Sequence, residues 1–312
     1  MIRVENLTKY YDGFCAVDHI NLSIQKGEIV GLLGPNGAGK TTTLRMLTGY
    51  LSPSSGTIQV KEYHIDKDPI RIKQLMGYLP ESAPLYQGML VFDFLNFIAG
   101  VRGIDGKIRE DRIRHLSDLC GLKDIMHLAV SELSRGLKQR VGLAHAMMTD
   151  PEILILDEPT SGLDPNQIVE IRDIIRRAGK KKTIILSTHI LSEAEATCDR
   201  VIIISRGKIV ADDDTKSLKQ LAGAEQSLKV TLKNADAGKA KELFESINGI
   251  STVLSIEDPA ADIISFRLTS REDQDLRQAV YEAVKKTDWI LMEMVKETRN
   301  LETVFRELTR EL

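Results

Sequence analysis

The sequence predicts an α/β fold followed by a small α+β domain, and three patterns support this prediction. Over residues 1–222, short apolar runs alternate with longer helical patterns, which is typical of a parallel sheet covered by helices. Within this part, strand patterns disappear between residues 84 and 150. Residues 225–312 carry a second series of strand and helix patterns. A chain of 312 residues is long enough for one large domain and one small one.

The first domain combines three kinds of pattern. Apolar runs predict four buried parallel strands, at 29–33, 153–156, 183–187 and 201–205. Residues 2–24 and 56–63 alternate apolar and polar side chains, which predicts an antiparallel β subdomain beside the main sheet. Between 84 and 150, the apolar spacing at 91–100 and 108–119 is that of helix faces. We therefore interpret residues 84–150 as an inserted helical subdomain.

The second domain has a recognisable order of elements. Its patterns are a strand (227–232), a helix (236–247), two strands (250–256 and 262–268), a helix (272–286), a strand (288–295) and a last helix (300–310). The first six elements follow the order βαββαβ, which predicts a ferredoxin-like fold. This part of the sequence has no glycine-rich phosphate loop.

Composition excludes several classes of protein. There are 42 lysines and arginines against 45 acidic residues, so the net charge of -3 gives no reason to expect nucleic acid as the partner. The amino terminus is charged where a signal peptide would be apolar, and no run approaches the roughly 18 uncharged residues of a spanning helix. Cys15, Cys120 and Cys198 are widely spaced, which fits ordinary thiols in a reducing compartment rather than a zinc site or disulfides.

A glycine-rich segment follows the first apolar run. It matches the phosphate-loop pattern G-x-x-x-x-G-K-[ST] with Gly34, Pro35, Asn36, Gly37, Ala38, Gly39, Lys40, Thr41 and Thr42. The strand pattern before it and the helix pattern after it favour a phosphate loop over an incidental glycine-rich turn. Backbone N–H groups and the helix start would face the phosphates, Lys40 would reach the outer phosphates, and the Thr41 hydroxyl would bind magnesium. The sequence therefore predicts that the protein binds a nucleoside triphosphate.

Two acids end the second apolar run, and a histidine ends the third. Asp157 is suited to hold magnesium through water, and Glu158 to face the attacking water. The alternative is that these acids only cap the strand end before Pro159. His189 would lie at the same edge of the sheet, where a lone histidine is more often a satisfied polar residue than a catalytic one. The phosphate loop upstream favours the catalytic interpretation for all three residues.

A further segment indicates which kind of nucleoside-triphosphate-binding protein this is. Residues 133–141 read Leu-Ser-Arg-Gly-Leu-Lys-Gln-Arg-Val, and the acid pair follows them. Here the sequence resembles the ATP-binding-cassette (ABC) ATPases over about residues 1–218. The matching residues are Ser134, Gly136, Gln139 and Arg140 in the family signature, Ser161, Gly162, Leu163 and Asp164 in its D-loop, His189 as its switch histidine, and Tyr11 as the aromatic residue that stacks on adenine.

The resemblance implies a P-loop cassette that hydrolyses ATP with magnesium and works as a pair. Each ATP would lie between the phosphate loop of one cassette and Ser134 and Gly136 of another, which is either a second copy or a paralogous cassette. A helix start such as theirs offers free N–H donors to a γ-phosphate. The isolated chain should then be a poor ATPase. Lys40, Glu158 and His189 are the catalytic residues that the resemblance implies.

The sequence departs from the commonest family pattern at several positions. Glu81 stands where the family usually has a glutamine that touches magnesium; it is either a metal ligand or a solvated loop acid. Arg135 and Leu137 replace a glycine and a glutamine of the signature, and Arg135 either adds charge to the phosphate contact or points to water. At Glu81, Pro80, Thr42 and the last predicted helix, the sequence resembles the ATPase subunits of type 2 exporters, including drug-efflux and gliding-motility-associated ones.

The resemblance also implies a partner and a place in the cell. The partner would be an integral-membrane permease, and the chain would lie on the cytoplasmic face of the membrane. Apolar residues in the segment 84–98 would line a groove for the permease or pack in the core; they are Leu85, Tyr86, Phe92, Phe94 and Phe97. The alternatives are a soluble ABC ATPase acting on nucleic acid or ribosomes, and a nucleotide-gated regulatory module.

Overall fold

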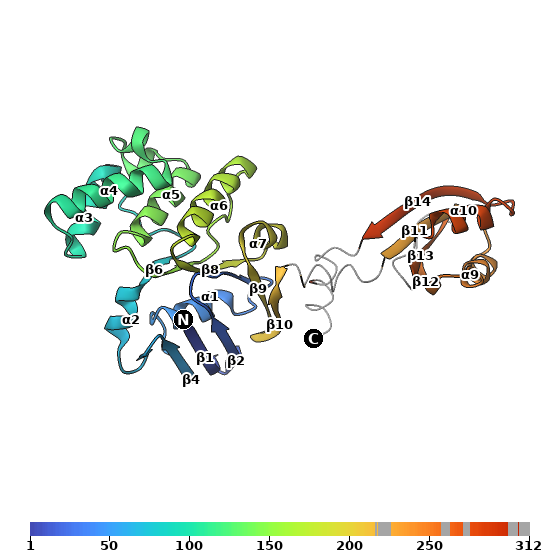
Figure 1. The fold of residues 1–312 in the computed structure, drawn as a ribbon, viewed down its shortest axis with the longest axis horizontal. Coiled ribbons are helices and arrows are strands. Elements are labelled where there is room, and N and C mark those ends of the chain that lie inside the picture. The colour runs from blue at the N-terminus through green and yellow to red at the C-terminus, as the bar shows by residue number, and fades with distance from the viewer. Residues whose placement is uncertain (216, 218–225, 257–262, 271–274, 299–304, 306–312) are drawn as a thin grey trace. The chain divides into compact units, whose positions relative to one another are not determined.

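The computed structural model describes the chain except for residues 216, 218–225, 257–262, 271–274, 299–304 and 306–312. The described residues divide into two compact units, one formed by residues 1–215 and one that lies within residues 226–305 (Figure 1). The predicted boundary, between residues 222 and 225, falls outside the described residues and stays a prediction.

A six-stranded sheet forms the centre of the first unit. Its strands, in spatial order, are β10 (Lys208–Asp214), β9 (Arg200–Ser205), β3 (Ile29–Leu33), β8 (Thr183–Thr188), β7 (Ile153–Leu156) and β6 (Met76–Leu79). All neighbouring pairs are parallel except β9 and β10. Every residue of β3, β7 and β8 is buried, as expected for strands that are covered on both faces. The four predicted strands are confirmed, whereas β6 and β10 were not predicted.

A smaller antiparallel sheet accompanies this sheet. Its order is β2 (Phe14–Ile24), β1 (Ile2–Tyr11), β4 (Ser55–Val60) and β5 (Tyr63–His64). Asp12 and Gly13 join β1 to β2, with φ of 43° and 90°, as a two-residue hairpin of this hand requires. One apolar cluster contains buried side chains from both sheets and from α1 (Lys40–Leu47), among them Val4, Leu44 and Ile185. The predicted β subdomain is therefore confirmed, and its core is continuous with that of the main sheet.

Helices dominate the segment between β6 and β7. They are α3 (Val91–Val101), α4 (Gly106–Cys120) and α5 (Arg135–Ala146), with short 3-10 turns at Lys123–Ile125 and Val130–Glu132. In Figure 1 these green helices lie at one end of the first unit, and the blue strands β1, β2 and β4 lie at the other. The unit also contains α2 (Pro69–Leu75), α6 (Pro165–Gly179) and α7 (Leu191–Thr197). The helices expected at 91–100 and 108–119 are confirmed.

The second unit has the predicted order of elements. These are β11 (Gln226–Lys233), α9 (Ala237–Glu245), β12 (Ile250–Ile256), β13 (Ile263–Ser270), α10 (Arg277–Val284) and β14 (Ile290–Thr298). The sheet order β12-β13-β11-β14, antiparallel throughout, is that of a ferredoxin-like fold. Phe244 and Phe266 meet in its core with ring centroids 5.4 Å apart. The predicted helix 300–310 lies outside the described residues except for Phe305.

Two general properties of the chain bear on the site. No helix among the described residues is both long and apolar enough to cross a membrane. Cys120 and Cys198 are buried, and burial raises the pKa of each thiol to about 12. Cys15 is half-buried in β2, beside the hairpin turn.

Candidate nucleotide site

A pocket of about 360 Å³ collects most of the predicted site residues. The segments that follow β3, β7 and β8 contribute to it, so it lies at the carboxyl edge of the parallel sheet, where open α/β folds bind their ligands. It is lined by Tyr11, Phe14, Ala16, Asn36, Gly37, Ala38, Gly39, Lys40, Thr41, Thr42, Glu81, Glu158, Ser161 and His189. The predicted site residues that do not line it are Gly34, Pro35, Asp157, Ser134 and Gly136.

The glycines of the loop are required by the backbone. Gly39 has a φ of 107°, and a Cβ added to it would lie 2.5 Å from the carbonyl oxygen of Ala16. A Cβ on Gly34 would lie 2.3 Å from the carbonyl oxygen of Ile204 in β9. Gly39 caps α1 without a side-chain hydrogen bond, so the first N–H groups of this helix are free to face an anion. The loop therefore has the shape and the donors of a phosphate cradle.

Lys40, Glu158 and His189 form a connected polar network on the pocket wall. The Lys40 Nζ donates hydrogen bonds to the carbonyl oxygens of Gly34 (2.8 Å) and Pro35 (3.2 Å). It also lies 3.3 Å from Oε1 of Glu158. The other oxygen of Glu158 lies 2.8 Å from Nδ1 of His189. Because Lys40 and Glu158 are only 6% and 8% exposed, this pairing satisfies charges that would otherwise be costly to bury.

Asp157 and Glu158 are adjacent in sequence, but their carboxylates have different partners. Glu158 has a φ of 48°, a left-handed conformation that is uncommon for residues other than glycine. Its backbone N–H donates to Oγ of Ser187 (2.9 Å), and the Ser187 hydroxyl donates to Oδ1 of Asp157 (2.7 Å). Ser187 is fully buried and was not assigned a role from the sequence. The polar end of the otherwise apolar run 183–187 was the signal that could have indicated it.

Asp157 and Thr41 provide oxygen donors for a metal. The Thr41 hydroxyl donates to Oδ1 of Asp157 at 3.0 Å. Thr41 lines the pocket, whereas Asp157 lies behind it and is 1% exposed. Magnesium prefers oxygen ligands and is commonly held by one or two protein groups together with water and substrate phosphates. A hydroxyl and a carboxylate beside a phosphate cradle therefore fit magnesium.

Aromatic side chains form the edge of the pocket at the β1–β2 hairpin. Tyr11 is 42% exposed, and the Nζ of Lys9 lies 5.4 Å from the centre of its ring. A cation on one face leaves the other face of the ring for a flat ligand. Phe14 pairs with Tyr11 across the turn and is 65% exposed. Sequence reasoning missed Phe14, although its place opposite Tyr11 across an Asp-Gly turn is readable from the sequence. Glu81 is exposed and lines the same pocket.

The signature residues lie on α5, outside this pocket. Ser134 is exposed and caps the helix, because its Oγ accepts a hydrogen bond from the N–H of Leu137 (3.3 Å). A Cβ on Gly136 would lie 2.5 Å from Cδ of Gln167, so α5 approaches the side chain of Gln167 on α6 closely at this glycine. The Arg135 guanidinium lies against Gly162, where an added Cβ would meet its Nη1 at 2.4 Å. Arg135 thus packs on the D-loop of its own chain.

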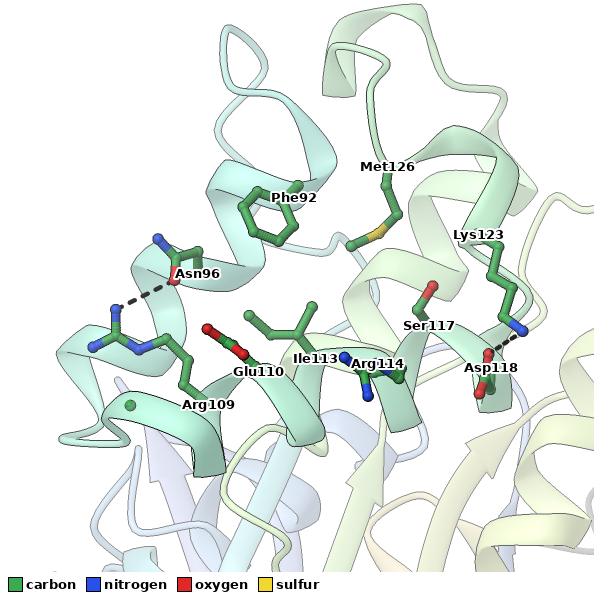
Figure 2. A pocket seen from close by; sticks show the side chains of 11 residues that line it. Phe92, Asn96, Arg109, Glu110, Ile113, Arg114, Ser117, Asp118, Lys123 and Met126 are labelled. Carbon is green, nitrogen blue, oxygen red and sulfur yellow. Dashed lines mark hydrogen bonds and ion pairs between the residues drawn. The ribbon is translucent and has the colours of Figure 1, made fainter.

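A larger cavity lies in the helical segment. Its volume is about 610 Å³, and Figure 2 shows its lining residues on α3, α4 and the following turn. Three of its charged groups already have partners, since Arg109 donates to Asn96 (3.2 Å) and Lys123 lies 2.7 Å from Asp118. None of the residues predicted to bind the nucleotide lines it, although Phe92 of the segment 84–98 does. The smaller pocket at the sheet edge is therefore the candidate nucleotide site.

Comparisons with known proteins agree with this site. The ABC transporter family matches residues 17–161. The chain is 39% identical over 236 residues to the probable multidrug ABC transporter ATP-binding protein YbhF of Escherichia coli, covering 75% of this chain but only 41% of YbhF. It is 39% identical to the bacitracin transport ATP-binding protein BcrA of Bacillus licheniformis, over 70% of this chain and 72% of BcrA.

A solved structure resembles the fold. It is that of cbiO1 from Clostridium perfringens, described as part of the ABC transporter complex cbiONQ. The TM-score is 0.64 at 30% sequence identity, and the match covers 70% of this chain and 89% of that one. The predicted fold class is therefore confirmed.

Proposed function

Because the chain belongs to the ABC transporter family of ATP-binding proteins, we propose that it binds ATP with magnesium, hydrolyses it and drives a separate membrane permease. The observation that carries this proposal is the pocket in which the phosphate loop, Glu158 and His189 converge. The names of YbhF and BcrA concern multidrug and bacitracin transport, which favours an exporter over a protein that acts on nucleic acid or ribosomes. The same two names favour an exporter over a purely regulatory module.

In the proposed reaction, the residues act by positioning and by charge. The free N–H groups of the loop and the Lys40 ammonium group hold the phosphates. To do so, Lys40 gives up its hydrogen bonds to the carbonyl oxygens of Gly34 and Pro35 and donates to phosphate oxygens instead. Glu158 orients the attacking water and accepts its proton, and His189 steadies Glu158 and the γ-phosphate region. Thr41 and Asp157 would hold magnesium, which neutralises phosphate charge, and Glu81 would contribute from the pocket edge. Tyr11 would stack on adenine.

We propose that Ser134 and Gly136 serve a nucleotide bound by another cassette, either a second copy or a paralogue. Both residues lie at the start of a helix and outside the pocket of their own chain, and Ser134 is exposed. The Glu158→Gln variant should therefore pass from monomer to dimer when ATP and magnesium are added, as measured by light scattering. Adding Ser134→Arg should keep it monomeric, because the bulky cation blocks the helix start. A dimer that forms equally well with Ser134→Arg would contradict this pairing.

We further propose that the permease docks beside the aromatic residues of segment 84–98, on the cytoplasmic face of the membrane. Phe94 and Leu85 are buried, whereas Tyr86 and Phe97 are 54% and 42% exposed, with rings 5.7 Å apart. A neighbouring cavity of about 470 Å³ contains Pro84. Leu85 and Phe94 therefore fit packing in the core, and Tyr86 and Phe97 fit a groove for the permease. Phe97→Ser should weaken co-purification of the chain with its permease, while Val169→Ser, an exposed change on α6, should not.

The domain organisation remains part of the proposal. We assign residues 1–222 to the ATP-binding domain and 225–312 to an accessory domain with a ferredoxin-like core. A chain cut after residue 222 should bind ATP with unchanged affinity if the two domains fold independently. Loss of ATP binding by the shortened chain, with its fold intact by circular dichroism, would contradict this assignment.

A further inference from the structure

Glu193, on α7, joins the two loops that carry Glu158 and His189. Its Oε2 accepts a hydrogen bond from the Thr160 hydroxyl at 2.5 Å and another from the Thr188 hydroxyl at 3.1 Å. Thr160 lies in the loop after β7, and Thr188 is the last residue of β8. Both threonines are buried, with exposures of 9% and 1%. A single carboxylate oxygen therefore clasps two separate segments of the chain.

This clasp lies next to the catalytic residues in sequence but outside their pocket. Thr160 is two residues beyond Glu158, and Thr188 immediately precedes His189. Glu193 and Thr160 line a separate cavity of about 330 Å³, whereas Glu158 and His189 line the nucleotide pocket. The same two loops are thus joined twice, by the bond between Glu158 and His189 at the pocket and by the Glu193 clasp outside it.

The clasp is also coupled to the backbone beyond the histidine. The Thr188 Oγ1 accepts a hydrogen bond from the N–H of Ile190 at 3.0 Å, so the residues on both sides of His189 are fixed by one hydroxyl. The second oxygen of Glu193, Oε1, is buried without a hydrogen-bond partner. A buried polar atom left unpaired destabilises the fold, and in native proteins such atoms call for a specific explanation.

We propose that Glu193 is a positioning residue for ATP hydrolysis, holding the two loops at the separation at which His189 Nδ1 meets Glu158 Oε2. It acts through these residues and does not touch the nucleotide. The inference rests on the proposed ATP hydrolysis. It differs from a purely structural role because it requires the loss to fall on turnover rather than on folding or on ATP affinity.

Steady-state hydrolysis by the full-length chain, assayed together with its partner cassette and permease, tests this role. Glu193→Ala should lower kcat about tenfold or more, because loosened catalytic geometry is costly, while KM for ATP changes by less than about twofold. Glu193→Gln keeps an oxygen that can accept from both hydroxyls, so it should retain most of the turnover. Ser192→Ala, a neighbouring exposed change on the same helix, is the matched control and should behave as wild type. Circular dichroism gives the folded fraction by which each rate is divided.

A double-mutant cycle separates positioning from independent effects. If Glu193 acts through His189, adding Glu193→Ala to His189→Ala should cause little further loss of kcat. Thr160→Val removes one arm of the clasp with the carboxylate kept, and it should lower kcat in the same sense if Glu193→Ala fails to fold. Unchanged kcat in folded Glu193→Ala or Thr160→Val, or additive losses with His189→Ala, would overturn the positioning role alone. A wild-type chain that binds ATP but does not hydrolyse it, even with its partner cassette and permease present, would overturn the proposed function as well.

Discussion

Strands β7 and β8 carry a charged cluster at each of their ends. At the amino ends, Asp150 lies 2.6 Å from the Nζ of Lys182 and 3.0 Å from Nη2 of Arg112. At the carboxyl ends, Glu158 lies between Lys40 and His189. Each cluster is built on one carboxylate that contacts two basic side chains. Only the second one lines the candidate nucleotide pocket.

The basic groups of both clusters also donate to backbone carbonyl oxygens, so the difference lies in the backbone donors and the open space beside each cluster. Arg112 donates to the carbonyl oxygens of Met147 and Met148, and Lys182 donates to that of Pro151, so the donors at the amino ends are occupied by the protein itself. At the carboxyl ends, a glycine loop and a helix start leave N–H groups facing a cavity of about 360 Å³. Charge alone therefore does not make a site. Open space and free donors beside the charge do.

The largest expected effect is at the carboxyl ends. Glu158→Gln should keep ATP binding, because the phosphate loop is unchanged, but it should lower kcat at least about 100-fold by removing the proton acceptor. Glu152→Gln, the same change just before β7, removes only the partner of Lys61 and should leave kcat unchanged. The measurement is phosphate release, with nucleotide affinity determined by fluorescence titration. Wild-type turnover in Glu158→Gln would show that the two ends do not differ in chemistry.

Ser187→Ala should give an intermediate effect and would sharpen the comparison. The change leaves both Oδ1 of Asp157 and the N–H of Glu158 without this buried partner. We expect a loss of about 1–3 kcal/mol in the free energy of unfolding and about a tenfold lower kcat. Chemical denaturation and hydrolysis assays measure the two effects. If stability falls and kcat does not, Ser187 supports the fold only, as Asp150 is expected to do.

Asp150→Asn tests the amino ends. Asn tolerates the φ of 53° at this position but removes the charge, so the unfolding free energy should fall by about 1 kcal/mol with kcat per folded molecule unchanged. Burial raises the pKa of Asp150, but the hydrogen bond from Lys182 and the charge of Arg112 outweigh it and leave the pKa below its usual 3.8. The stabilisation is therefore complete above pH 3.8 and is lost as the pH falls through the lower pKa of the folded state.

Denaturation of wild type and Asp150→Asn at several pH values checks this dependence. The difference in stability between the two chains should be constant near neutral pH and should shrink in acid. A fall in kcat at full folding would instead mean that the amino ends take part in the reaction.

The smallest effect is expected from His145, which belongs to neither cluster. Burial lowers the pKa of its imidazole below the usual 6.5, and the nearby charge of Arg102 lowers it further. Because the unfolded chain binds this proton more readily, stability should fall as the pH drops from 6.5 toward the pKa of the folded state. His145→Phe should remove this component, changing the melting temperature by at most about 2 °C between pH 7 and 6. An unchanged pH dependence of the melting temperature would contradict it.

The sequence predicts what depends on neighbouring residues along the chain. The four central strands are readable because they are continuous apolar runs, and the loop from Gly34 to Thr42 because its spacing is fixed by phosphate geometry. Strand β6 is missed because Gly77, which approaches the carbonyl of Ala146, interrupts its apolar run, whereas β7, of the same length, is apolar throughout. The roles of Ser187 and Glu193 arise from contacts between segments about 30 residues apart, which no local pattern encodes. Residue types therefore predict which side chains bind the ligand, whereas the residues that hold those side chains in place, such as Ser187 and Glu193, are found only in the folded structure.

The uneven burial of the three thiols gives the unmodified chain a natural labelling position. At the mildly alkaline pH used for maleimide coupling, thiols with a pKa of about 12 stay protonated and enclosed, so Cys120 and Cys198 should resist the reagent. Cys15 is the accessible thiol of the three and sits between Phe14 and Ala16, both of which line the nucleotide pocket. A fluorophore coupled there would be attached one residue from the pocket wall, on the opposite face of β2, without any engineered cysteine.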